Sequence, residues 1–216
     1  MCDVGMYSLI REYADLIIKD YIGNQHVQQY DWLTSNLMSM NVSTNSLFKQ
    51  AYKKFWAMNA ARLTPDFFDA YFVYLEENKH GSSINIREVC DYLYSIPTDK
   101  QGDKSLQFSF ASKLVHMISP IQPIYDSRIR QFYFLPDGQS SKDFSRKISE
   151  LMLMYGFLKE EYKRIIEDSL LKEPIIKFRQ QLKPKTFTDE KVIDSLIWGF
   201  VSHAGISIIS GSLKYT

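Results

Sequence analysis

The chain has 216 residues, of which 45% are hydrophobic and 14% aromatic, a composition that supplies a sizeable core and argues against intrinsic disorder. Its formal net charge of +1 argues against a strongly basic protein that binds nucleic acid without specificity. Two cysteines, Cys2 and Cys90, lie far apart, which excludes a disulfide framework, a cysteine-rich zinc site and a four-cysteine iron–sulfur cluster.

A helical period of apolar residues recurs along the first half of the chain. Apolar residues at i, i+3, i+4 and i+7 predict one helix from Met6 to Tyr21, ended by Gly23, and another over 47–56. Thr64-Pro65-Asp66 is a strong start for a third helix, because it offers a capping hydroxyl, a first-turn proline and an acid. That helix runs through Leu75 and is aromatic on nearly all sides, which predicts a central, buried helix.

The second half continues the same pattern. We predict helices over 86–94, 105–119, 126–133, 144–155, 162–170 and 188–200, with a polar loop over 98–104 and a turn over 136–141. Pro174 is expected to kink or end the helix before it, and the tail from Ile206 is apolar and β-prone. The sequence therefore predicts an all-α protein, a single compact domain over 1–216 with a possible two-lobe seam near 98–104.

Charge is unevenly distributed, which bears on the partners of the chain. Residues 1–100 carry nine basic and twelve acidic residues, whereas residues 101–216 carry 17 and 13. The basic clusters of the second half are either solvated helix faces or a surface that faces phosphate. We expect no membrane partner, no metal site and no cofactor. Because the N-terminus lacks the pattern of a secretory signal, we also expect a cytoplasmic location.

One lysine lies within an otherwise apolar helical pattern. Low-dielectric surroundings let the amine of Lys113 lose a proton more easily. Asp126 opens the next helix, where backbone N–H groups and the helix dipole favour the ionised carboxylate. An amine nucleophile and a carboxylate placed this way can open a C–N bond at a sugar carbon. Both residues can equally be structural, the lysine reaching past its neighbours to solvent and the aspartate only capping a helix.

The segment 105–133 resembles the core of the helix–hairpin–helix DNA glycosylases, in particular the 8-oxoguanine DNA glycosylase-like branch. Ser109–Ala111 stands at the family's tight Gly-hydrophobic-Gly turn, Ser112-Lys113 at its Thr-Lys position, and Pro123–Asp126 at its aspartate motif. The resemblance implies that Lys113 attacks the sugar carbon of a damaged nucleotide and forms a Schiff base. It also implies that Asp126 supports charge development and proton transfer.

This interpretation suggests further site residues, because the target base must leave the stack and enter a lined pocket. The candidate pocket residues are His116, Tyr125 and Trp198, and the candidate DNA contacts are Ser109, Ala111, Ser112, Arg128 and Arg130. The Cβ atoms of Ser109 and Ala111 depart from the glycine pattern and hinder both a tight turn and close approach to a phosphate. The alternatives are an interior histidine, core aromatics and surface ion pairs.

Three functions are consistent with these residues. The first is a DNA glycosylase or abasic-site lyase that acts on a flipped nucleotide through Lys113 and Asp126. The second is a non-catalytic descendant of the same fold that binds nucleic acid or a protein. The third is a structural or regulatory helical protein in which the two residues simply pair. The base recognised and the oligomeric state are left open by the sequence.

Overall fold

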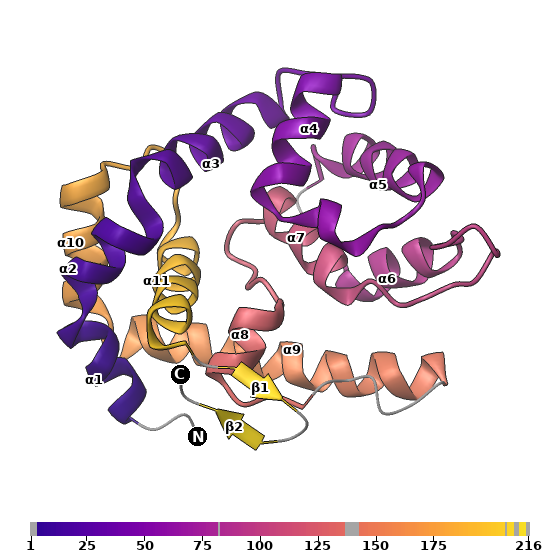
Figure 1. Cartoon of the computed structure of the whole chain (residues 1–216). Helices are drawn as coiled ribbons and strands as arrows, with labels where there is room; N and C mark the ends of the chain where they lie inside the picture. Colours follow the sequence, from indigo (N-terminus) through magenta and orange to yellow (C-terminus); the bar gives the residue numbers. More distant parts are fainter. Residues whose placement is uncertain (1–3, 82, 137–142, 206, 210–211, 215–216) are drawn as a thin grey trace. The chain divides into compact units, whose positions relative to one another are not determined.

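A computed structural model describes residues 4–81, 83–136, 143–205, 207–209 and 212–214. The chain divides into two compact units (Figure 1): unit 1 consists of Met1–Val27 with Pro123–Thr216, and unit 2 of Gln28–Gln122. The boundaries fall after Val27 and after Gln122, whereas the expected seam at 98–104 lies inside unit 2. The single domain over 1–216 stays a prediction.

The described elements are helices apart from one short hairpin, which confirms the predicted all-α class. Unit 1 contains α1 (Val4–Glu12), α2 (Ala14–Leu16), the π-helical η1 (Ile17–Ile22), α8 (Ser127–Phe132), α9 (Phe144–Glu167), α10 (Lys172–Leu182), α11 (Asp189–Ala204), β1 (Ser207–Ile209) and β2 (Ser212–Lys214). Unit 2 contains α4 (Ser46–Phe55), the 3-10 helix η2 (Met58–Ala61), α5 (Pro65–Asn78), α6 (Ile86–Tyr94) and α7 (Phe108–Ile118), and α3 (Gly23–Leu37) crosses the boundary. The strands pair antiparallel, with Ser207 opposite Lys214.

The core of unit 1 is organised around α11, which packs against η1, α8 and α10 (Figure 1). The helix begins as predicted, because the Thr188 side chain accepts a hydrogen bond from the Lys191 N–H, and it ends at Gly205 in the left-handed conformation. Nearly every residue from Lys191 to Val201 is buried. A glycine, Gly199, lies where α11 meets the Ile17 side chain of η1, so the two helices approach closely.

The core of unit 2 is organised around α7, which packs against α5 and α6. All residues from Phe110 to Met117 are buried. The prediction that the aromatic helix α5 is a central, buried helix is wrong, because Val73 on its outer side is 40% exposed. Its aromatic rings bury one face, through Phe67, Tyr71 and Phe72, and that face alone is enough to fix the helix.

Three local predictions need correction. Helix α3 was not expected, since the buried residues Val27, Tyr30, Leu33 and Leu37 are interspersed with polar ones. The helices expected at 144–155 and 162–170 are one helix, α9, because a buried face continues across Gly156 despite its low helix propensity.

Pro174, the third correction, lies in the first turn of α10 rather than at a helix end. Its missing N–H costs nothing in that turn, since the first four N–H groups of a helix lack intrahelical partners. The turn expected over 136–141 falls, from residue 137, outside the described residues. None of the helices among the described residues is both long and apolar enough to span a bilayer.

We predict that Gly199→Ala destabilises the protein. The added Cβ would lie 2.7 Å from Ile17 Cγ2, a separation that forces either the side chain or a helix to move. Overpacking of this kind costs about 1–3 kcal/mol, measured as a lower free energy of unfolding in urea.

The matched control is Gly156→Ala in α9, where a Cβ meets nothing within 4 Å. This substitution should raise the free energy of unfolding by about 0.5–1 kcal/mol, since alanine is the better helix former. Equal effects of the two substitutions would contradict the close approach of α11 and η1.

Candidate active site

Lys113 lies inside unit 2 with its side chain almost entirely buried, at 7% exposure. Its Nζ donates a hydrogen bond of 3.2 Å to the backbone carbonyl of Trp56. The same atom lies 5.5 Å from the ring centroid of Phe110, a cation–π distance. The amine therefore does not reach past its neighbours to open solvent, which was the structural alternative for this residue.

The acceptor of this hydrogen bond is placed by the end of α4. Helix α4 ends at Phe55 with Trp56 as its C-cap, and the next residue, Ala57, adopts a left-handed conformation with φ of 52° that turns the chain sharply. The carbonyls at a helix C-terminus carry partial negative charge, which attracts an ammonium group. Sequence analysis missed both Trp56 and Phe110. Phe110 could have been found from its i, i+3 spacing to Lys113, whereas nothing local connects residue 56 to residue 113.

His116 follows Lys113 by one turn and is buried, at 1% exposure. Its Nδ1 donates to the Gln122 carbonyl at 2.7 Å, because a carbonyl can only accept, and its Nε2 lies 2.9 Å from the Tyr30 hydroxyl. Both ring nitrogens are thus engaged within unit 2. The role of His116 as a pocket residue stays a prediction; in the structure it ties α7 to the connection that follows it.

The tight turn that the resemblance places at Ser109–Ala111 is absent, because all three residues belong to the first turn of α7. Without glycines these residues lack the freedom to adopt positive φ, and they continue the helix instead. Ala111 and Ser112 are fully buried, whereas Ser109 is partly exposed. A buried side chain offers no surface to a phosphate. Of the candidate DNA contacts Ser109, Ala111 and Ser112, only Ser109 therefore has an accessible surface.

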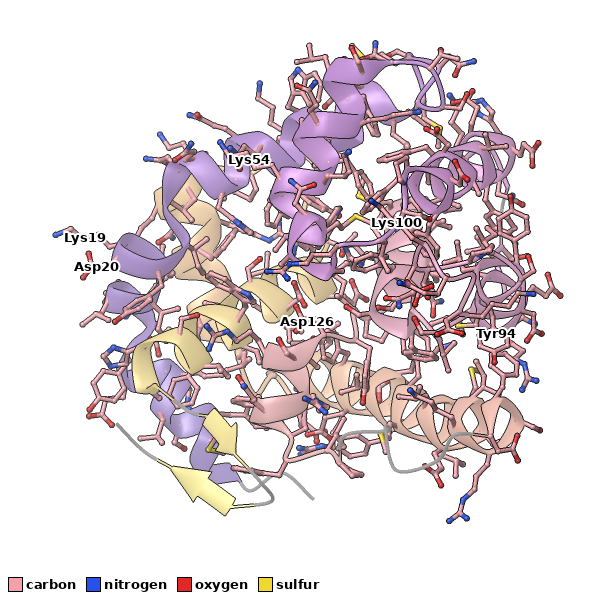
Figure 2. All side chains as sticks on the ribbon, turned by 45° about the vertical axis from the view of Figure 1, so that its right-hand side comes forward. Lys19, Asp20, Lys54, Tyr94, Lys100 and Asp126 are labelled. Carbon is pink, nitrogen blue, oxygen red and sulfur yellow. The ribbon has the colours of Figure 1, made fainter. Side chains whose placement is uncertain are left out.

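Asp126 caps α8, as predicted (Figure 2). Its Oδ1 accepts hydrogen bonds from the N–H groups of Arg128 and Ile129, at 2.9 and 3.0 Å. The side chain is partly exposed, as are those of Arg128 and Arg130 in the same helix. The carboxylate is therefore fixed by the backbone and still accessible.

Helix α9 anchors the motif that leads to Asp126. The Tyr155 hydroxyl donates to the Pro123 carbonyl at 3.0 Å, and the Tyr125 hydroxyl lies 3.4 Å from Met154 Sδ. Tyr125, a predicted pocket residue, is buried at 6% exposure. Its hydroxyl contacts α9, so it serves as a packing contact of the motif in this structure.

Unit 1 also contains a network of buried tyrosines and charges. The Tyr7 hydroxyl donates to Glu161 at 2.6 Å and lies 3.2 Å from that of Tyr133. Burial raises the pKa of Glu161, but hydrogen bonds from Arg164 and Tyr7 outweigh it and keep that pKa below the usual value. Burial, with the nearby Tyr133 and Glu161, raises the pKa of Tyr7 far above its ordinary value.

The remaining pocket candidate, Trp198, is 38% exposed on α11. It stacks on His26, with ring centroids 6.4 Å apart and an interplanar angle of 20°. Burial, with a smaller contribution from the charge of Lys191, lowers the pKa of His26 to about 3. His26 is thus neutral at physiological pH, and its neutral ring supports the indole.

Lys113 belongs to unit 2 and Asp126 to unit 1, and each is fixed by contacts within its own unit. Within the described ranges, no three His, Cys, Asp or Glu side chains gather in a way that could hold a metal ion. Comparison of the chain with protein-family models, curated proteins and solved structures gave no match. The functional interpretation therefore depends on the motif residues and their surroundings.

We predict that Lys113→Met leaves the free energy of unfolding unchanged or raises it by up to about 2 kcal/mol. The reason is that methionine fills a similar volume without the cost of burying an ammonium group. The control is Lys191→Met, which removes the ammonium that lies 2.7 Å from Asp194 Oδ2 in the interior of unit 1. That change leaves a buried carboxylate without its ion-pair partner and should cost about 3–5 kcal/mol. A large loss for Lys113→Met as well would show that its burial serves stability.

We predict that stability falls as the pH drops below 6.5, in part through His26. The folded-state pKa of this histidine, about 3, is depressed below its ordinary value of 6.5, so the unfolded chain binds the proton first. Between these two values the free energy of unfolding should fall by about 1.4 kcal/mol per pH unit from this group alone.

The His26→Phe variant keeps an aromatic ring against Trp198 but has no group at this position that can bind a proton. Urea denaturation between pH 7 and 4 should therefore show a shallower fall for the variant than for the wild type. Parallel curves would contradict the neutral state of His26.

Proposed function

We propose that the protein is a DNA glycosylase or abasic-site lyase that uses Lys113 as an amine nucleophile and Asp126 as its acidic partner. The observation that carries the proposal is the buried amine of Lys113, enclosed by the Trp56 carbonyl and the Phe110 ring. Lysine is rare in a protein interior unless it is paired, since burial of an ammonium group is costly. The resemblance of segment 105–133 to the glycosylases supports the same role.

Asp126 supports the proposal because its surroundings suit a carboxylate that acts on developing positive charge. Two backbone N–H groups fix Oδ1, and the side chain remains partly exposed. Loss of a base from a nucleoside builds oxocarbenium-like charge on the sugar, which a nearby carboxylate stabilises. In the proposal the same group also exchanges a proton during the reaction.

In the proposed reaction the neutral amine of Lys113 attacks C1′ as the bond between C1′ and the base nitrogen breaks. The bonding electrons leave with the base, which takes up a proton. The nitrogen of the adduct loses a proton, its lone pair forms a C=N bond, and the sugar ring opens as O4′ takes up a proton. At an abasic site, the amine and the C1′ aldehyde give the same imine with loss of water.

The second candidate function, a non-catalytic binding module, is favoured by one observation. The residues at the hairpin position are helical, and Ala111 and Ser112 are buried, so this segment lacks the backbone geometry that grips a phosphate. Under this alternative, DNA or a protein binds with an affinity that Lys113→Gln and Asp126→Asn leave unchanged.

We predict that borohydride traps a covalent complex between the wild-type protein and a duplex that contains an abasic site. Reduction of the imine converts C=N to a stable secondary amine, seen as a slowly migrating band on a denaturing gel. Lys113→Gln should abolish the band. Lys100→Gln, which alters an exposed lysine of the same unit (Figure 2), should leave it intact.

Asp126→Asn separates the two chemical steps. Asparagine caps a helix as well as aspartate does, so the fold is retained. The variant should release 8-oxoguanine from a duplex about a hundredfold more slowly than the wild type. It should still form the trapped complex at an abasic site. The proposal is refuted if the wild type gives no covalent complex, or if Lys113→Gln gives as much as the wild type.

A further inference from the structure

The Tyr162 hydroxyl has no hydrogen-bond partner among the described residues, although the side chain is only 2% exposed. Tyr162 lies on α9 in the interior of unit 1. A buried hydroxyl without a partner is destabilising, and native interiors rarely leave one so. A phenol donates one hydrogen bond, so an acceptor close to this hydroxyl is needed.

Most of the polar groups around Tyr162 already have partners. The Asp194 carboxylate accepts from Lys191 at 2.7 Å, and the hydroxyls of Tyr7 and Tyr133 lie 3.2 Å apart. Burial raises the pKa of Tyr162 well above its ordinary value, and the nearby Asp194, Tyr133, Asp126 and Tyr7 raise it further. Asp194, Tyr7 and Tyr133 therefore already take part in other contacts.

The charge of Asp126 also acts on the Tyr162 phenol. Its Oδ1 accepts two backbone hydrogen bonds, whereas its Oδ2 accepts none from the described residues. The Tyr162 hydroxyl thus lacks an acceptor and Asp126 Oδ2 lacks a donor among the described residues. Both groups belong to unit 1, and the charge of one acts on the other.

Tyr162 lies on the helix that contacts the aspartate motif. The Tyr155 hydroxyl, on α9, donates to the Pro123 carbonyl at the start of the aspartate motif. Tyr162 follows Tyr155 by seven residues, which is two helical turns and hence the same face of the helix. Tyr155 and Tyr162 therefore share one face of α9, and this face contacts the start of the aspartate motif.

We propose that Tyr162 is a positioning residue for Asp126, and that the Tyr162 hydroxyl donates through one bridging water molecule to Oδ2 of the carboxylate. With Oδ1 fixed by two amides and Oδ2 by the bridged phenol, rotation of the carboxylate about its terminal bond is restricted. The consequence for base release rests on the proposed function, whereas the contact itself does not.

A double-mutant cycle tests the contact without any activity. Tyr162→Phe should lower the urea midpoint in the wild-type background, because it removes a hydrogen bond to a charged group. In the Asp126→Ser background, where serine still caps α8 but provides no carboxylate, Tyr162→Phe should leave the midpoint unchanged or raise it.

The matched control for the cycle is Tyr52→Phe, which removes a buried hydroxyl that lies 2.8 Å from that of Tyr71 in unit 2. Its effect on the midpoint should be the same in both backgrounds. The inference is overturned if Tyr162→Phe has equal effects in the two backgrounds, or if it raises the wild-type midpoint.

Kinetics then separate positioning from general destabilisation. Tyr162→Phe should slow release of 8-oxoguanine about tenfold and leave the rate of trapping at a preformed abasic site within about twofold of the wild type. Equal slowing of both steps would indicate a merely structural role and overturn the inference. If the wild type neither releases the base nor is trapped, the proposed function fails, and the cycle alone still decides whether Tyr162 holds Asp126.

Discussion

Burial of the Lys113 amine is the constraint on which the candidate site depends. An ammonium group loses most of its hydration in an interior, and the Trp56 carbonyl and the Phe110 ring face are among the groups that replace it. The carbonyl becomes available because Trp56 is the C-cap of α4 and the chain then turns through a left-handed Ala57. The surroundings of a single side chain thus depend on where another helix stops.

A chain of tyrosines fixes the helix that carries this lysine. The Tyr52 and Tyr71 hydroxyls lie 2.8 Å apart, and that of Tyr71 donates to the Phe110 carbonyl at 3.2 Å in the first turn of α7. Phe110 in turn provides the ring that faces the amine. The aromatic content of the sequence therefore does more than fill a core, since hydroxyl groups on it orient the backbone of α7.

Unit 1 supplies the acidic partner by a different route. Asp126 is fixed locally, by the N–H groups of the helix that it caps, while α9 anchors the preceding motif through the Pro123 carbonyl. Buried charges nearby are paired, as in Lys191 with Asp194 and Arg164 with Glu161. This pairing lets an interior rich in ionisable groups stay folded, whereas Asp126 is held through Oδ1 by two backbone N–H groups.

The sequence by itself determined the features that depend on neighbouring residues. The helix starts at Thr64, Asp126 and Thr188 were predictable, because a cap and its acceptor lie within three positions of each other. Only the tertiary structure decided which helix is the most deeply buried. It also decided that the Trp56 carbonyl accepts a hydrogen bond from the Lys113 amine, and that His116 contacts Tyr30 and Gln122. These contacts join residues far apart in the chain or depend on where a helix ends, and no periodicity within one helix encodes them.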